Sequence, residues 1–135
     1  MQRHNPVSIR PRFSLLVILI ILNTAAAWSQ NRNLSGGIVF DGEPFLAVNP
    51  QNPQHMVVAW MGYVFLNRIS IKTRVSFNGG QSWSNTVTIP HAADGYTSAD
   101  PSLDFDGAGN VFLSYIDHDD EEAGAVYLRK STDGG

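Results

Sequence analysis

After residue 28, the apolar positions fall into short runs that alternate with polar turns. Most runs are rich in β-branched or aromatic residues, and clusters of Asn, Pro, Gly and Asp separate them. Such runs predict short β-strands. No stretch in this part has the spacing of an amphipathic helix, so the pattern predicts an all-β fold. The expected strands are about 45–48, 56–61, 69–76, 86–89, 102–105, 110–116 and 125–131.

The second group of expected strands repeats the first. Three pairs of segments match in residue type at a displacement of 55 or 57 residues, and the difference falls in a turn. Insertions confined to turns, with the strands in step, indicate one structural unit used twice. The pairs are Glu43–Val48 with Asp100–Phe105, Val57–Trp60 with Phe112–Tyr115, and Ser76–Gly80 with Ser131–Gly135.

The N-terminal residues have a different composition. Arg3, Arg10 and Arg12 carry positive charge with no acid among them, and an apolar run from Phe13 to Leu22 follows, interrupted by one serine. Small residues then appear at Ala25–Ala27. A basic segment, a short apolar core and a small-residue exit together predict a secretory signal peptide.

We expect residues 1–27 to be the signal peptide and residues 28–37 to be a flexible leader. Cleavage after Ala27 fits best, and cleavage after Ser29 also satisfies the small-residue requirement. A retained membrane anchor is the alternative, although spanning a bilayer takes about 20 apolar residues and this core is shorter. The expected location is therefore secreted, periplasmic or at the cell surface.

Charge and cysteine content argue against several classes of partner and of site. Loss of the signal peptide leaves six basic and twelve acidic residues, a net charge of −6. This balance disfavours nucleic acid or anionic lipid as a partner. With no cysteine in the chain, disulfides, thiolate metal sites and cysteine nucleophiles are excluded.

One short motif suggests a family. The segment Ser76–Trp83 fits S-x-[DN]-x-G-x-[ST]-W, and this resembles the Asp box (BNR repeat) of sialidase-like β-propellers. We expect its Asx side chain to bond backbone amides and its glycine to adopt positive φ. The Trp ring is expected to pack between blades. The matching positions are Ser76, Asn78, Gly80, Ser82 and Trp83, with Ser131, Asp133 and Gly135 beginning a second box.

The resemblance implies a β-propeller, six-bladed in the full protein, whose blades are four-stranded antiparallel sheets. About two blades are expected in this chain: the first over about 38–90 and an incomplete second over about 98–135. Propellers have about four to eight blades. The remaining blades are therefore expected outside this chain.

Sialidases suggest a test for catalysis. The resemblance implies an arginine triad that grips the substrate carboxylate, an acid/base Asp, and a Tyr nucleophile assisted by Glu. Where the first arginine is expected, the chain has Gly42–Pro44, and Met61–Arg68 contains no acid. We identify no catalytic residue here, and expect a carbohydrate-binding or scaffold protein. The alternative is an exo-sialidase or other glycoside hydrolase whose catalytic residues lie mostly beyond residue 135.

Glu43 and Asp100 are candidate channel-lining residues. They occupy equivalent positions at the starts of the two expected inner strands, where they could bind a hydroxylated or cationic ligand. In the alternative, each carboxylate bonds nearby backbone amides. The expected partner is a glycan or glycoconjugate, with no cofactor.

No metal site is expected. Asp104–Asn110 faintly resembles a calcium loop, but Ala108 and Tyr115 stand where oxygen ligands are needed, which favours a plain β-turn. The histidines have no spacing typical of zinc. The acidic run Asp117–Glu122 is expected to be a solvated hairpin loop.

Overall fold

The structure is a computed structural model that describes residues 1–2, 31–37, 39–64, 68–121 and 123–135. The chain divides into two units, Met1–Arg32 and Asn33–Gly135, and the fold below is that of the second. The expected signal peptide lies almost entirely outside the described residues. Within the described ranges, none of the chain forms a helix long and apolar enough to cross a membrane.

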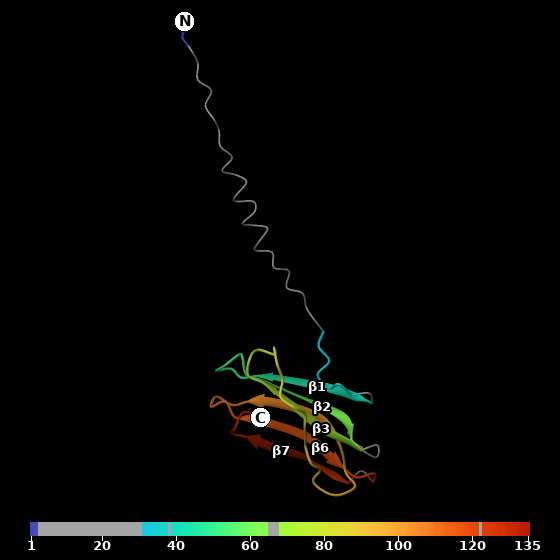
Figure 1. The fold of residues 1–135 in the computed structure, drawn as a ribbon. Coiled ribbons are helices and arrows are strands. Elements are labelled where there is room, and N and C mark those ends of the chain that lie inside the picture. The colour runs from blue at the N-terminus through green and yellow to red at the C-terminus, as the bar shows by residue number, and fades with distance from the viewer. Residues whose placement is uncertain (3–30, 38, 65–67, 122) are drawn as a thin grey trace. The chain divides into compact units, whose positions relative to one another are not determined.

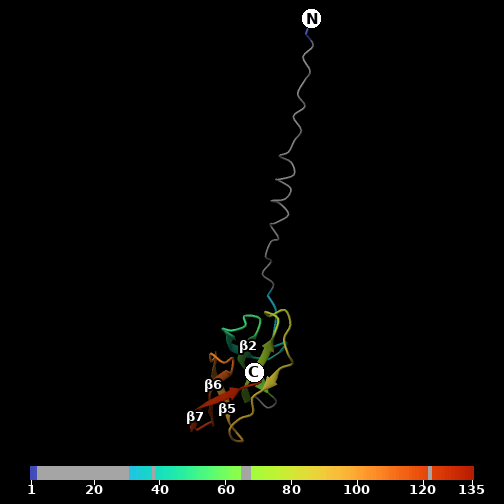
Figure 2. The same ribbon diagram turned by 90° about the vertical axis from the view of Figure 1, so that its left-hand side faces the viewer.

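The Asn33–Gly135 unit consists of two antiparallel sheets, which confirms the all-β prediction (Figures 1 and 2). The first sheet has the strand order β1-β2-β3-β4 and the second β5-β6-β7. Each expected strand is present, and β1 and β5 begin several residues earlier than predicted. The strands are β1 (Asp41–Val48), β2 (Met56–Val64), β3 (Arg68–Ser76), β4 (Val87–Thr88), β5 (Thr97–Phe105), β6 (Val111–His118) and β7 (Gly124–Ser131).

Both sheets share one irregularity in their strand pairing. The register between β1 and β2 shifts between Gly42 and Phe45, and that between β5 and β6 shifts between Ala99 and Ser102. Such bulges twist a strand and redirect its side chains. Because both sheets have this bulge at equivalent positions, the sequence repeat is also a structural repeat.

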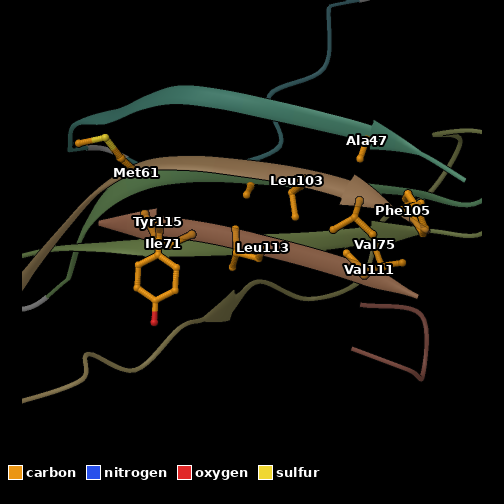
Figure 3. Packing of buried hydrophobic residues seen from close by; sticks show 11 residues of the cluster. Ala47, Met61, Ile71, Val75, Leu103, Phe105, Val111, Leu113 and Tyr115 are labelled. Carbon is orange, nitrogen blue, oxygen red and sulfur yellow. The ribbon is translucent and has the colours of Figure 1, made fainter. Parts of the chain in front are cut away.

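The hydrophobic core lies between the two sheets (Figure 3). In β6 the buried and partly exposed residues alternate, as expected for a strand with one face in a core. We call the two packed surfaces the covered face of the first sheet and the covering face of the second. The covered face comprises Ala47, Val57, Ala59, Met61, Ile71 and Val75, and the covering face comprises Leu103, Phe105, Val111, Leu113 and Tyr115.

The two sheets pack front to back. Leu113 and Tyr115 on the covering face correspond in the repeat to Val58 and Trp60. Val58 and Trp60 neighbour core residues along β2, so they point away from the covered face. The sheets therefore meet through different faces of the same unit, and this kind of contact can be repeated by further units.

Candidate functional site

The bulges of β1 and β5 carry one acid each. Glu43 and Asp100 are exposed and have φ angles of 49° and 54°. This left-handed backbone costs a non-glycine residue on the order of 1–3 kcal/mol. In both repeats a proline follows, Pro44 or Pro101, and its missing N–H suits an edge strand that has lost its regular pairing.

Stacking of the sheets brings these two acids together. A hydrogen bond with the Asp100 carboxyl group, assisted by partial desolvation and by the charge of Asp100, raises the pKa of Glu43 above its ordinary value. Two carboxyl groups this close favour the state in which they share a proton. The pair can accept hydrogen bonds from a hydroxylated ligand or attract a cationic one.

A shallow hollow of about 480 Å³ adjoins Asp100 on the second sheet. The imidazole of His118 also lines it, and its Nδ1 lies 2.7 Å from the carbonyl oxygen of Asp119. The hollow thus combines polar groups with an apolar floor, as ligand sites commonly do. Its remaining lining residues are Ala99, Ile116, Gly124, Ala125 and Val126.

Replacing Glu43 with glutamine is expected to stabilise the fold at neutral pH. In the unfolded chain Glu43 has its ordinary pKa of 4.5, whereas Asp100 raises this pKa in the folded state. The folded protein therefore loses stability as the pH rises from about 4.5 through the raised pKa, because both carboxylates become charged. Thermal unfolding at a series of pH values should show a higher Tm for Glu43→Gln at pH 7.

The pH series and a second variant provide two controls for the effect of Glu43→Gln. The gain in Tm should shrink as the pH falls below about 4.5, where the wild-type Glu43 is already protonated in both states. Glu121→Gln makes the same charge change at an exposed turn and should show no such pH-dependent gain. An equal effect of the two variants would show that Glu43 and Asp100 do not interact.

The first motif forms a tight turn after β3, closed by its own side chains. Ser76 Oγ donates to Asn78 Oδ1 at 3.0 Å and accepts from the Gly80 amide at 2.9 Å. Asn78 Oδ1 also accepts from the Ser82 amide at 2.8 Å. Gly80 has a φ of 83°, a conformation that glycine adopts without steric cost.

The second motif forms the same turn after β7. Ser131 Oγ donates to Asp133 Oδ1 and accepts from the Gly135 amide at 2.8 Å. This turn reaches the first repeat, because the Gly134 carbonyl lies 2.7 Å from His55 Nε2. His55 is buried, and its Nδ1 lies 3.1 Å from Asn49 Nδ2. A tautomer with its proton on Nε2 satisfies both contacts.

Trp83 does not lie between the two described sheets. Its ring is half-buried, and it does not belong to the buried cluster between the two described sheets. Its indole nitrogen instead donates to the carbonyl oxygen of Gly80 at 3.1 Å, within its own turn. Since Gly80 also lies near Met56 on the side of β2 away from the core, Trp83 packs beside the first sheet rather than between the two.

The most extensive buried polar cluster surrounds Asp117, and here the sequence-based expectation was wrong. Asp117 is not in a solvated loop, because it belongs to β6 and has no exposed surface. Its Oδ1 lies 2.8 Å from His91 Nδ1 and accepts from Ser98 Oγ at 3.0 Å. Its Oδ2 accepts from the Ala92 amide at 2.6 Å. Buried alternation along β6 was the available signal that the acidic run begins inside a strand.

Ser70 completes a chain of contacts that resembles a Ser-His-Asp triad. Its Oγ lies 2.8 Å from His91 Nε2, on the other side of the ring from Asp117. Triads are recognised by such geometry, but Ser70 is only 3% exposed. A nucleophile must reach its substrate, so this arrangement does not support nucleophilic catalysis. These contacts join β3, β6 and the segment between β4 and β5.

Within the Asp104–Asn110 segment, β5 ends at Phe105 and residues 106–110 form a turn, as the sequence favoured. Asp106 Oδ1 accepts from the amides of Ala108 and Asn110 at 2.9 and 2.8 Å, and Oδ2 accepts from Asn110 Nδ2 at 2.6 Å. These bonds hold the pKa of Asp106 below its ordinary value. Across the described residues, no group of three His, Asp or Glu side chains could hold a metal ion.

Comparison with models of known protein families finds no match. Comparison with curated proteins also finds no match.

Proposed function

We propose that the chain is part of an Asp-box β-propeller, similar to the sialidase-like proteins, and that it binds a carbohydrate rather than cleaving one. The propeller proposal is supported by the stacking of repeated antiparallel sheets front to back, as neighbouring blades of a propeller stack. Equivalent turns at Ser76–Ser82 and Ser131–Gly135 give it further support.

The observation that carries the binding proposal is the meeting of Glu43 and Asp100. The first strand of each blade lines the central channel of a propeller, so both acids would face that channel. Their oxygens can accept hydrogen bonds from sugar hydroxyls, and such bonds to charged groups are stronger than neutral ones. The apolar floor of the adjoining hollow offers a surface for the face of a sugar ring.

The same pair argues against hydrolysis. Glycosidases that use two carboxyl groups hold them about 5 to 9.5 Å apart, on either side of the bond they cleave. The hydrogen bond that raises the pKa of Glu43 joins it to Asp100, and a hydrogen-bonded pair is closer together than that spacing. A sialic acid carboxylate would also be repelled by this pair.

Calorimetric titration with defined oligosaccharides tests the proposal. We expect neutral or amino-sugar oligosaccharides to bind and sialyllactose not to bind. The double variant Glu43→Gln with Asp100→Asn should weaken binding at least about tenfold, because it removes charged acceptors. The control, Asp94→Asn with Asp120→Asn, makes the same charge change at exposed turn residues and should bind normally.

Two results would refute the proposed function. One is turnover of a fluorogenic sialoside or neutral glycoside by the chain, which would make it a hydrolase. The other is oligosaccharide binding that the double variant leaves unchanged, which would place the ligand away from Glu43 and Asp100.

A further inference from the structure

The turn after β3 contains the one Asn–Gly pair in the sequence, Asn78 followed by Gly79. The amide carbon of an asparagine side chain can close a ring with the backbone nitrogen of the next residue. Glycine at that next position has no side chain to hinder the approach, and asparagine is among the thermolabile residues of proteins. Asn78 is therefore the asparagine of this chain that is most prone to lose its side-chain amide without an enzyme.

We propose that Asn78 is a site of spontaneous deamidation, and that the folded turn blocks this reaction until the turn opens. In the reaction the backbone nitrogen of Gly79 bonds to Cγ of Asn78, and the bond from Cγ to Nδ2 breaks. The proton of the Gly79 amide passes through solvent to the departing nitrogen, which leaves as ammonia. The product is a cyclic succinimide. Water, the only co-reactant, then opens the ring at one of its two carbonyl groups and gives either aspartate or isoaspartate.

The attacking nitrogen is already hydrogen-bonded in the folded protein. The Gly79 amide donates to the carbonyl oxygen of Gln54 at 2.9 Å, and Gln54 lies in the turn that precedes β2. Ring closure needs this nitrogen without its proton and directed at Cγ of Asn78. The hydrogen bond to Gln54 must therefore break before the reaction can begin.

The side chain of Asn78 is held at both of its polar atoms. Its Oδ1 accepts from Ser76 Oγ at 3.0 Å and from the Ser82 amide at 2.8 Å. Its Nδ2 donates to Ser82 Oγ at 2.7 Å. Ser76 is only 1% exposed, so water does not readily replace it as a partner. Turning the amide group of Asn78 towards the Gly79 nitrogen would break these bonds, so ring closure requires local opening of the turn.

The two products differ in whether they fit the turn. Aspartate fits, because Asp133 occupies the equivalent position of the second motif and its Oδ1 accepts from Ser131 Oγ. Isoaspartate runs the backbone through the former side chain and lengthens it by one carbon, which displaces the amides of Gly80 and Ser82 from their acceptors. The turn can therefore close again around aspartate, whereas isoaspartate permanently marks a turn that has opened.

Peptide mapping of the full chain by mass spectrometry, after incubation at mildly alkaline pH, tests the proposal. Folded wild type should convert Asn78 to aspartate and isoaspartate at least about tenfold more slowly than the same chain in guanidinium chloride, because the reaction needs the opened turn. Ser76→Ala removes buried bonds to Asn78 and Gly80 and should speed conversion in the folded state about tenfold. Ser82→Ala removes the bond to Asn78 Nδ2 and should speed it about threefold.

Ser131→Ala makes the same change in the second motif and is the matched control, so it should leave the conversion of Asn78 unchanged. Circular dichroism before incubation establishes that each variant is folded. If Ser76→Ala is not folded, Ser82→Ala decides the test, because Ser82 is exposed.

Three results would overturn the proposal. Conversion of Asn78 as fast in the folded wild type as in guanidinium chloride would show that the turn does not protect it. Folded Ser76→Ala and Ser82→Ala proteins that react no faster than Ser131→Ala would show that the bonds to Asn78 do not hold the reaction back. An unfolded chain in which Asn78 converts no faster than Asn85, which precedes a threonine, would show that Asn78 is not a preferred site.

Discussion

Asp117→Ala is expected to lower the free energy of unfolding by about 3–5 kcal/mol, because it removes a buried carboxylate that several polar groups contact, and each buried donor left unpaired costs about 1–3 kcal/mol. Asp117 is fully buried and accepts hydrogen bonds from Ser98 and the Ala92 amide, with His91 at 2.8 Å. Alanine would leave these polar groups without their acceptor, and buried unpaired donors are costly. Urea unfolding followed by circular dichroism measures the change.

Two further variants test whether the buried carboxylate of Asp117 causes this loss. Asp117→Asn preserves the volume and one oxygen acceptor but removes the charge, so its loss should fall between that of alanine and wild type. Asp120→Ala removes an exposed carboxylate three residues later and should change stability by less than about 0.5 kcal/mol. If Asp117→Ala cost no more than Asp120→Ala, the cluster around Asp117 would contribute nothing to holding the sheets together.

A comparison of the repeats explains why that cluster could not be predicted. Asp117 pairs across the strands with Ser98, and the equivalent pair in the first sheet is Gly62 with Asp41. Each sheet therefore places one carboxylate at the same point, but from opposite strands. In the first sheet Asp41 accepts from Trp60 at 2.9 Å and from Lys72 at 3.2 Å. The sequence repeat hides this exchange because neither position keeps its residue type.

The contacts of Asp41 in the first sheet could not be predicted either. Although burial alone would raise the pKa of Asp41, hydrogen bonds from Ser35, Trp60 and Lys72 together hold it below its ordinary value. Ser35 lies in the segment expected to be a flexible leader, where Asn33 Oδ1 accepts from the Gly36 amide at 2.9 Å. Partners far apart in sequence decide these contacts, so no local pattern could have indicated them.

Local patterns were sufficient where the interactions themselves are local. Alternation of apolar residues predicted the strands because side chains of a strand point to opposite faces. The turns at Asn78 and Asp106 involve residues within four positions of each other, and their Asx and glycine content marked them. By contrast, the position of Trp83 depends on which sheet lies beside it, and a motif does not contain that information.

The contact between Glu43 and Asp100 could be predicted from the sequence only in part. The sequence placed both acids at equivalent strand starts, but their meeting requires the stacking of the sheets and the bulges that turn them. Positive φ at both residues could not be expected, because neither is glycine. The repeated left-handed backbone at an exposed acid is the feature that makes this position a candidate binding site.

Ile71→Ala is expected to cost about 2–5 kcal/mol, whereas Val126→Ala at the equivalent position of the second sheet should cost less than about 1 kcal/mol. Ile71 is fully buried against the second sheet, but Val126 is 74% exposed. Urea unfolding followed by circular dichroism measures both values. Equal costs for the two variants would show that the second sheet does not cover Ile71.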